Sequence, residues 1–406
     1  MKFNYYYQIL IYTAFISLSC DDPNSPSDVW DPNDVGKSSP FISSIVPPDS
    51  AYAGSQEITI YGGNFGDNKD SVFVYFNTGS GEVISVDESS MIVIPPNIIS
   101  DSVIIKITAH GAFSFGEYEQ NYILHSRILE YGDFDALDES IWGLEADINE
   151  NLYVGLSIFP EGKIDKITPP QGIREYGFIN AVLQTPYSMR IGPDNYIYYV
   201  DAVNPYIIKQ NLSTGDPSYN TLPGVAFDLD FDENGNLYCG GSSQNLYKVN
   251  RDLSSSVVAD YMDISIRAIR VFNGFVYVGG IYSGTDSTVP LVGVWRNQIL
   301  SSEGVLGEKE IVLDWNSLSG SSSNITGITF DENGVMYISS DADIAIGVYS
   351  VEGVFNELFP KIISAPIAKM TWGSDNYLYL NYRGDPRAVF RLDMGINGTT
   401  YHGRSQ

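Results

Sequence analysis

The residue types that most often carry out acid–base chemistry are scarce in this chain. It has three histidines, His110, His125 and His402, and none of them lies within the long stretch from residue 126 to residue 401. Because histidine is the commonest general base, a catalytic centre in that stretch would have to work without one. Cys239 and the serines show no recognisable pairing with a base, and no Cys or His spacing is typical of zinc sites. We therefore predict no catalytic residues, no cofactor and no bound metal.

Two Asp-Glu-Asn-Gly segments, which start at Asp232 and Asp331, are the candidates for calcium binding. Both lack the remaining ligands of a calcium-binding loop. Both also recur at the same place in a repeated pattern and precede a strand-like run, which is typical of tight turns. We interpret them as turns.

Composition sets the class of the elements that must position any site. The 406 residues include 50 Asp and Glu against 22 Lys and Arg, a net charge of −28 that would repel phosphate backbones, so nucleic acid is not an expected partner. Hydrophobic residues make up 43% of the chain, which is enough for folded cores. Short apolar runs broken by glycine, proline and asparagine predict an all-β protein.

The N-terminus has the pattern of an export signal. Residues 1–19 contain one lysine, an apolar stretch and small residues just before Cys20. This resembles a bacterial lipoprotein signal peptide, which implies that Cys20 is lipidated; an ordinary signal peptide or a transmembrane anchor is the alternative. Asp21 and Asp22 resemble the surface-export signal of Bacteroidetes-like lipoproteins, which implies an outer membrane lipoprotein at the cell surface, with a periplasm-facing position as the alternative. Residues 20–39 read as a flexible acidic tether.

Residues 40–124 alternate short apolar strands, such as Val72–Phe76 and Val103–Ile107, with turns marked by glycine and proline. The segment from Gly63 to Gly66 (Gly-Asn-Phe-Gly) resembles the corner of an IPT/TIG immunoglobulin-like domain. We expect the two glycines to adopt positive φ and Phe65 to point into the core. The resemblance implies a β-sandwich that serves as a spacer or as an accessory binding module.

The region 126–406 contains a repeat that becomes visible when the chain is aligned on its tyrosines. Each copy is a strand, a tight turn and a second strand that begins with an apolar residue followed by tyrosine. The copies recur about every 40 residues, the period of a four-stranded propeller blade, with one longer interval between the fourth and fifth. The aligned tyrosines are Tyr153, Tyr198, Tyr238, Tyr277, Tyr337 and Tyr379.

These repeats resemble those of NHL-type and gluconolactonase-like propellers, although the fourth copy has a shortened turn and Gly373 replaces the turn aspartate in the sixth. The fold class that follows is all-β: an immunoglobulin-like β-sandwich plus a six-bladed β-propeller. The segment Ile128–Gly132 is similar to Ile173–Gly177, where the first blade's outer strand is expected. It therefore predicts that Ile128–Gly132 supplies the outer strand of the last blade, with Thr399–His402 as the alternative.

The resemblance to gluconolactonases implies a second function, a metal-dependent lactonase or hydrolase that holds a divalent cation in the centre of the ring. The residues available for it are Glu145, Asp228 or Asp230, and Asn324. Arg190, Arg270 and Lys369 occupy similar positions, and their charges would oppose a cation. This enzyme remains the alternative to a binding protein.

The loops at one rim of the expected ring mix aromatic residues with Asp, Asn and Arg, a combination that suits sugars. Each of these residues could instead simply pack or solvate the rim. We predict a non-catalytic protein that binds an extracellular glycan or a protein partner, with the aromatics of the long insertion as the leading candidates. The predicted rim residues are Trp142, Tyr187, Arg267, Trp315 and Asn324 in one set of loops, and Asp201, Tyr206, Tyr282, Asp341, Arg383 and Asp385 in the other.

Overall fold

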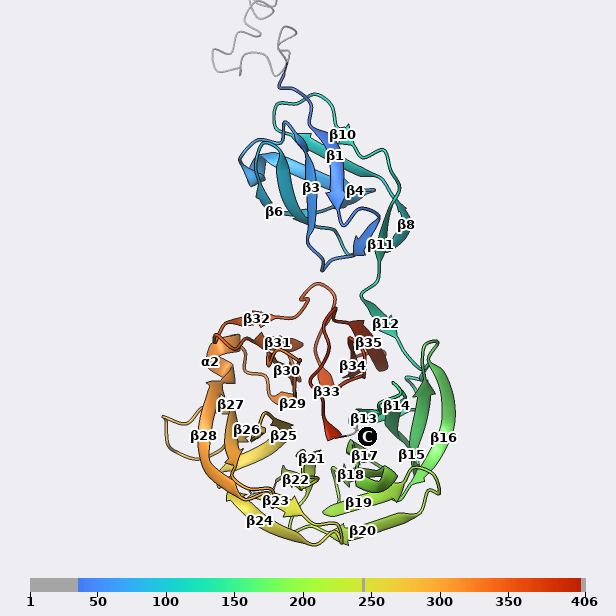
Figure 1. Cartoon of the computed structure of the whole chain (residues 1–406), viewed down its shortest axis with the longest axis vertical. Coiled ribbons are helices and arrows are strands. Elements are labelled where there is room, and N and C mark those ends of the chain that lie inside the picture. Colours follow the sequence, from blue (N-terminus) through green and yellow to red (C-terminus); the bar gives the residue numbers. More distant parts are fainter. Residues whose placement is uncertain (1–35, 243–244, 403–406) are drawn as a thin grey trace, which may run out of the picture.

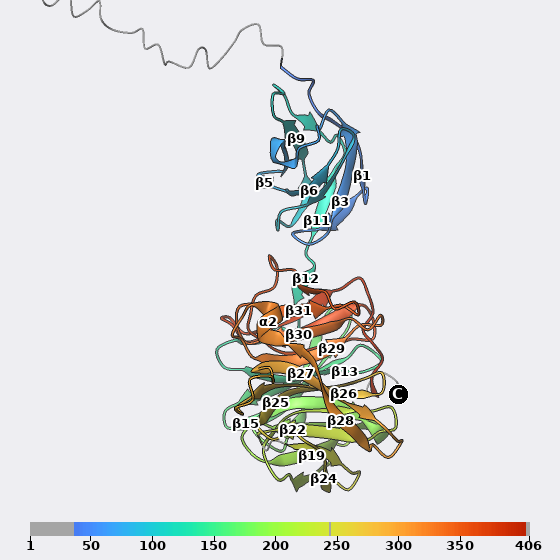
Figure 2. The same cartoon turned by 90° about the vertical axis from the view of Figure 1, so that its left-hand side faces the viewer.

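Two all-β units follow one another along the chain in the computed structural model, which describes residues 36–242 and 245–402 (Figure 1). In two views at right angles, the smaller unit lies beyond the rim of the larger, ring-shaped unit (Figure 2). The predicted signal peptide, Cys20 and most of the predicted tether lie outside the described residues. No helix within the described ranges is both long and apolar enough to cross a membrane.

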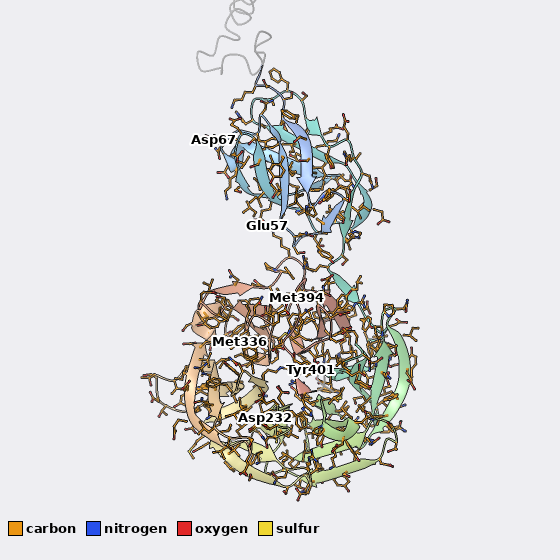
Figure 3. All side chains as sticks on the ribbon, in the orientation of Figure 1. Glu57, Asp67, Asp232, Met336, Met394 and Tyr401 are labelled. Atoms are coloured by element: carbon orange, nitrogen blue, oxygen red, sulfur yellow. The ribbon has the colours of Figure 1, made fainter. Side chains whose placement is uncertain are left out.

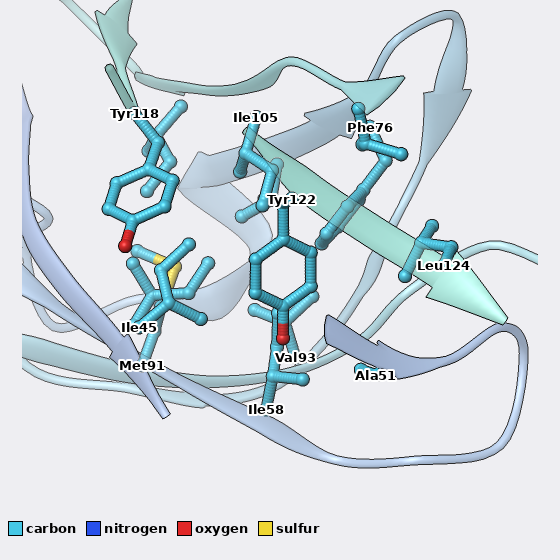
Figure 4. Packing of buried hydrophobic residues seen from close by; sticks show 14 of the residues in the cluster. Ile45, Ala51, Ile58, Phe76, Met91, Val93, Ile105, Tyr118, Tyr122 and Leu124 are labelled. Carbon is cyan, nitrogen blue, oxygen red and sulfur yellow. The ribbon is translucent and has the colours of Figure 1, made fainter. Parts of the chain in front are cut away.

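The smaller unit is an immunoglobulin-like sandwich. One sheet contains β1 (Phe41–Val46), β3 (Ile58–Gly63), β7 (Ser90–Ile94) and β6 (Glu82–Val86); another contains β10 (Gly116–Glu117), β9 (Ile105–Ala109), β4 (Val72–Phe76) and β5 (Gly79–Ser80); the last contains β2 (Ser50–Tyr52), β11 (Tyr122–His125) and β8 (Ser100–Val103). A 3-10 helix, η1 (Lys69–Ser71), precedes β4. Alternate side chains such as Ile58, Val93 and Tyr122 point inward and pack together (Figure 4).

Two details of the sandwich differ from the sequence-based expectation. At the corner, Gly66 has the expected positive φ of 83° and Phe65 is buried, but the second left-handed residue is Asn64 (φ 61°) and not Gly63. Asparagine tolerates this conformation. Gly63 is a glycine for a steric reason, because a Cβ at this position would collide with the ring of Phe41. The expected strand Val103–Ile107 is divided at Ile104, whose N–H donates to Asn77 Oδ1 (2.9 Å), so that the chain passes from one sheet to another.

The larger unit is a propeller of six four-stranded blades, which confirms the predicted fold class. The first three blades are β13 (Ser140–Ala146), β14 (Leu152–Ile158), β15 (Glu161–Thr168) and β16 (Ile173–Ala181); β17 (Pro186–Gly192), β18 (Tyr196–Asp201), β19 (Tyr206–Asn211) and β20 (Pro217–Thr221); and β21 (Ala226–Phe231), β22 (Leu237–Gly241), β23 (Asn245–Val249) and β24 (Ser255–Asp260). The next two are β25 (Ile264–Phe272), β26 (Phe275–Tyr282), β27 (Val292–Ile299) and β28 (Leu306–Asp314); and β29 (Ile325–Phe330), β30 (Met336–Ser340), β31 (Ile346–Tyr349) and β32 (Phe355–Glu357). Two short helices, η2 (Pro193–Asn195) and α2 (Trp315–Ser319), lie in connections.

The sixth blade combines both ends of the propeller sequence. It contains β33 (Ile367–Trp372), β34 (Tyr377–Tyr382) and β35 (Ala388–Asp393), and its outer strand is β12 (Ile128–Glu130). Ile128 pairs with Leu392 and Glu130 with Phe390, so the predicted closure by the N-terminal segment is confirmed. The alternative outer strand, Thr399–His402, is not used.

The acidic turns of the repeat are capped by their own aspartates. In the third blade, Asp232 Oδ1 accepts hydrogen bonds from the N–H groups of Asn234 and Asn236, and Tyr238 donates its hydroxyl to Asp232 Oδ2 (3.2 Å). Asp147 and Asp331 do the same in blades one and five. The interpretation of these segments as turns is therefore confirmed.

Blade six lacks the turn aspartate because Gly373 stands in its place, and a neighbouring blade supplies the missing carboxylate. Glu150, from the turn of blade one, accepts the hydroxyl of Tyr379 on Oε1 (2.9 Å). Its other oxygen accepts the N–H groups of Ser374 and Asp375 and the Ser374 hydroxyl. A Cβ at Gly373 would overlap this carboxylate. Glu150 thus fastens the first blade to the last.

Arg127 forms the centre of the junction between the sandwich and the propeller. Its Nε donates to Ser55 Oγ (2.8 Å), its Nη1 donates to the carbonyl of Asp393 (2.9 Å), and its guanidinium lies over the ring of Tyr52 (4.2 Å). Tyr52 donates its hydroxyl to Asp393, and burial together with this bond raises the pKa of Tyr52 to about 12. The sandwich is therefore fixed to the edge of blade six.

Candidate functional site

Every inner strand of the propeller has a β-bulge near its start. The face of the ring at which the inner strands begin is called here the front face, and the opposite face is the back face. At each bulge one residue, or two in blade one, has no partner in the neighbouring strand, and such bulges redirect side chains. The unpaired residues are Trp142 and Gly143, Tyr187, Phe227, Arg267, Thr326 and Ala368 in blades one to six.

The bulge residues of four successive blades, Trp142, Tyr187, Phe227 and Arg267, form a continuous line of contacts with Arg383, which follows β34 in blade six. We call these five residues the front crescent. The ring centroids of Trp142 and Tyr187 are 5.7 Å apart, and those of Tyr187 and Phe227 are 6.1 Å apart. A guanidinium covers each end, Arg383 over Trp142 at 4.1 Å and Arg267 over Phe227 at 4.8 Å. All five side chains are partly buried.

The front crescent carries hydrogen-bond donors that the described part of the protein leaves unsatisfied. Trp142 Nε1 and Arg267 Nε are both buried and have no acceptor there. Burial lowers the pKa of Arg383, and the nearby Arg387 lowers it further. Unpaired buried donors are costly unless something accepts from them.

Below the crescent lies a buried group of polar side chains. Lys369 is close to the ring of Tyr187 (5.1 Å), donates to the carbonyl of Phe227 (3.2 Å) and pairs with Asp228 (3.5 Å). Ser188 donates to the same carboxylate, and so does the N–H of Ile269 (2.8 Å). Lys369 and these hydrogen bonds keep the pKa of Asp228 low even though burial opposes this.

A second charged layer follows further along the inner strands, where charges of opposite sign alternate from blade one to blade four. Arg190 pairs with Glu145 (3.5 Å) on one side and with Asp230 (3.1 Å) on the other, and Arg270 also pairs with Asp230 (3.7 Å). Burial raises the pKa of Glu145 to about 7, although both arginines lower it. The centre of the ring is thus a neutralised ionic network.

This network tests the alternative of a metal-dependent enzyme. Each of the three carboxylates available for a cation, Glu145, Asp228 and Asp230, is already paired with an arginine or a lysine. Asn324, the remaining candidate ligand, bonds instead with Asp341 on the front face. The residues present therefore do not fit a divalent cation.

The C-terminal segment reaches the ring at the back face, where Gly398 bridges to Asp331 just after β29, and Tyr401 lies near the centre of the ring (Figure 3). Tyr401 donates its hydroxyl to the carbonyls of Trp372 (2.6 Å) and Ala146 (3.2 Å) and lies under Arg270 (4.5 Å). His402 stacks on Phe231 at 5.3 Å, and burial lowers its pKa. The expectation that a centre in this region would lack a histidine is therefore wrong, because the tail folds back across the inner strands and brings His402 to them.

The structure brings together four of the predicted rim residues, Trp142, Tyr187, Arg267 and Arg383. It contradicts the prediction for Trp315, which is fully buried, donates its indole N–H to Ser323 (3.1 Å) and packs against Phe355. The long insertion forms β27, β28 and α2 rather than an open loop, and Trp315 begins α2 with its ring in the core.

The other predicted rim residues lie in front-face loops or at the front ends of strands, and the hydrogen bonds of Asp201 and Asp341 are local. Asp201 accepts N–H groups of Val203 and Asn204, and Asp341 binds Asn324. Tyr206 and Tyr282 are half-buried against clusters formed by their own blade and the preceding one, and Asp385 is exposed. Their role in binding stays a prediction.

Sequence reasoning missed Phe227 and the position of Lys369. Phe227 occupies the bulge of blade three that is equivalent to the bulge of Tyr187 in blade two. Tyr187 directly precedes Ser188, Phe227 directly precedes Asp228, and these two polar residues are hydrogen-bonded to each other. Alignment of the inner strands on these polar residues would have placed Phe227 in the crescent.

The comparisons with known proteins agree with this architecture. The IPT/TIG domain model matches residues 40–122, so the sandwich is an IPT/TIG domain. None of the curated proteins matches the chain. A solved structure of a protein from Bacteroides thetaiotaomicron, described as a putative phosphatase, is 12% identical with a TM-score of 0.52 and covers 88% of this chain and 97% of its own. This likeness shows a shared fold.

Other solved structures are similar at a lower level. An auxiliary nutrient binding protein from Bacteroides ovatus is 13% identical, with a TM-score of 0.48 over 88% of this chain and 98% of its own. A gluconolactonase from Xanthomonas campestris is 13% identical, with a TM-score of 0.48 over 66% of this chain and 89% of its own.

Proposed function

We propose that this chain is a non-catalytic binding protein whose front crescent recognises an extracellular glycan, with the IPT/TIG domain as a spacer or accessory module. The observation that carries the proposal is the unbroken line of three aromatic rings, Trp142, Tyr187 and Phe227, presented by bulges in three successive blades. Aromatic faces stack on the C–H faces of sugars, while guanidinium and indole N–H groups donate to hydroxyl oxygens.

The polar groups beneath the crescent support binding over catalysis. A hydrolase needs a base or a nucleophile that is free to react with the substrate. Asp228 instead accepts from Ser188, Lys369 and the backbone, and Glu145 and Asp230 are paired with arginines. No observation favours the metal-dependent lactonase or hydrolase over the binding protein.

Replacing Trp142 with Ala is expected to weaken binding to the best ligand on a glycan array by about 10- to 100-fold, which corresponds to about 1–3 kcal/mol for losing one central aromatic contact. Tyr187→Ala should act similarly. The matched control is Tyr219→Ala, because Tyr219 is exposed on the outer strand β20. Melting temperatures of all three variants separate lost contacts from lost folding. Unchanged affinity of a folded Trp142→Ala protein would move recognition to another surface, and a bound protein partner with no glycan would overturn the proposed ligand class.

We also propose that Cys20 anchors the protein to the outer membrane by a lipid, with the propeller at the cell surface. The support is the small-residue segment before Cys20 and the acidic pair that follows it. Cys20→Ala should abolish labelling with a fatty-acid analogue and release the protein from membranes, whereas Cys239→Ala, which removes a buried thiol, should leave labelling intact. Labelling that survives Cys20→Ala would contradict the anchor. Protease treatment of whole cells distinguishes the surface from the periplasm.

A further inference from the structure

We propose that the glycan bound by the front crescent is acidic, and that Arg267 and Arg383 bind its carboxylate or sulfate groups. This inference rests on the proposed function and names its ligand class. It starts from a contrast in charge: the chain has a net charge of −28, yet cationic side chains gather around the crescent. These are Arg267 and Arg383 at its two ends, Arg387 beside Arg383, and Lys369 beneath it.

Three of these four cations have no carboxylate partner in the part of the chain that the structure describes. Lys369 pairs with Asp228, but no ion pair within the described ranges involves Arg267, Arg383 or Arg387. Arg387 donates only to a neutral acceptor among its described bonds, Ser140 Oγ at 2.8 Å. Two buried arginines of the propeller differ in this respect, because Arg174 binds Glu139 and Asp165, and Arg190 binds Glu145 and Asp230. Arg391 in blade six also forms no ion pair among the described residues, but only the front face gathers three such arginines around one line of aromatic rings.

The surroundings of Arg267 and Arg383 make an anionic partner favourable. Both are partly removed from water and lie on aromatic faces, where a guanidinium stacks while its N–H groups stay directed along its plane. Burial lowers the pKa of Arg383 because its charge is incompletely solvated. A carboxylate or sulfate that accepts two parallel N–H groups would compensate this loss of solvation.

Within the described residues, the front-face carboxylates Asp201, Asp341 and Asp385 form no ion pair with Arg267 or Arg383. The carboxylates of Asp201 and Asp341 accept hydrogen bonds from their own loops. Asp385 lies between Arg383 and Arg387 in sequence and is exposed to solvent. The aromatic rings supply the stacking surface, and the arginines at the two ends select for negative charge.

The test measures binding of the purified full chain to arrayed neutral oligosaccharides, uronic-acid oligosaccharides and sulfated oligosaccharides, followed by titration calorimetry with the best binder. We expect an acidic saccharide to bind at least 10-fold more tightly than its neutral counterpart. Arg267→Gln and Arg383→Gln should each weaken that binding at least 10-fold. Arg251→Gln is the control: it changes the net charge equally, but its exposed side chain follows β23 on the back face.

The possible outcomes separate this inference from the proposed function. Preference for uronates or for sulfates identifies the anion, and either supports the inference. A second outcome is that neutral and acidic saccharides bind equally well, that Arg267→Gln and Arg383→Gln do not change the affinity, and that Trp142→Ala still weakens it. This outcome would overturn the acidic ligand class, but it would agree with the proposed glycan-binding function. Binding of no saccharide class would overturn the proposed function and this inference with it. Equal losses in Arg251→Gln would assign the effect to net charge and contradict the proposed contacts.

Discussion

A propeller that begins at residue 140 is expected to melt about 10–20 °C below one that begins at residue 126, and to aggregate on heating. The shorter chain lacks β12, so β35 becomes an unpaired edge strand, which favours pairing between chains. It also loses Tyr131 and Phe134, which are both buried. The burial of each side chain contributes about 1.5–3 kcal/mol to the free energy of unfolding. Each kcal/mol lost lowers the melting temperature by roughly 2–4 °C for a domain of this size.

A point variant tests the same pairing in the full chain. Leu129 is half-exposed and pairs with Arg391 across the β12–β35 ladder. Leu129→Pro removes a backbone donor from this ladder, whereas Leu129→Ser keeps it and serves as the control. Thermal unfolding followed by circular dichroism should show a large decrease in melting temperature for Leu129→Pro and a small decrease for Leu129→Ser. Equal melting temperatures for the two chain lengths would show that β12 does not stabilise the ring.

The local features of this fold could be predicted from the sequence because they depend on neighbouring residues. Each hairpin is specified by a turn aspartate, such as Asp232, that binds the backbone only a few residues later. Ring closure was also predictable, since Ile128–Gly132 repeats the sequence of an outer strand. In both cases one short segment contains the whole signal.

The front crescent could be predicted only in part, because a bulge of one residue decides which side chain is redirected. Trp142, Tyr187 and Arg267 were identified by their place before the inner strands, but Phe227 was not, since it reads as an ordinary apolar strand residue. The prediction that Trp315 lies at the rim was wrong for the opposite reason. Its burial depends on how β27 and β28 extend across blade four, and the sequence of the insertion does not specify this.

Contacts between distant segments were the least predictable. Tyr401 and His402 reach the ring centre only because the tail crosses the back face after the sixth blade ends. The carboxylate of Glu150 acts on Tyr379, which belongs to another blade. Gly373 signalled that an aspartate was missing from blade six, but nothing local identified its replacement.

The replacement of Glu150 with Ala is expected to lower the free energy of unfolding by about 2–4 kcal/mol, because several polar groups lose their acceptor. Tyr379 is fully buried, and the Glu150 carboxylate accepts its hydroxyl together with the turn N–H groups of Ser374 and Asp375. Chemical denaturation measures this change. The matched control is Glu233→Ala, which removes an exposed glutamate from the equivalent turn of blade three.

The backbone of Glu150 supports a special role for its side chain. Its φ is 64°, a left-handed conformation, and the corresponding turn positions of blades three and five are Gly235 and Gly334, with φ of 78° and 82°. A non-glycine residue held in this region costs of order 1 kcal/mol, which the bonds to blade six offset. Glu150→Gly removes the same carboxylate without this strain, so it should be less harmful than Glu150→Ala.

A second substitution makes the role of Glu150 specific to blade six. Gly373→Asp restores the turn aspartate that blades one, three and five possess, but in the native chain its side chain would collide with Glu150. Alone it should therefore destabilise the protein. Combined with Glu150→Gly it should recover much of the lost stability, because the new carboxylate can accept the hydroxyl of Tyr379 as Asp232 accepts that of Tyr238. Such a coupling between two positions is measured by a double-mutant cycle. Additive losses in the double variant would mean that Glu150 does not substitute for the missing aspartate.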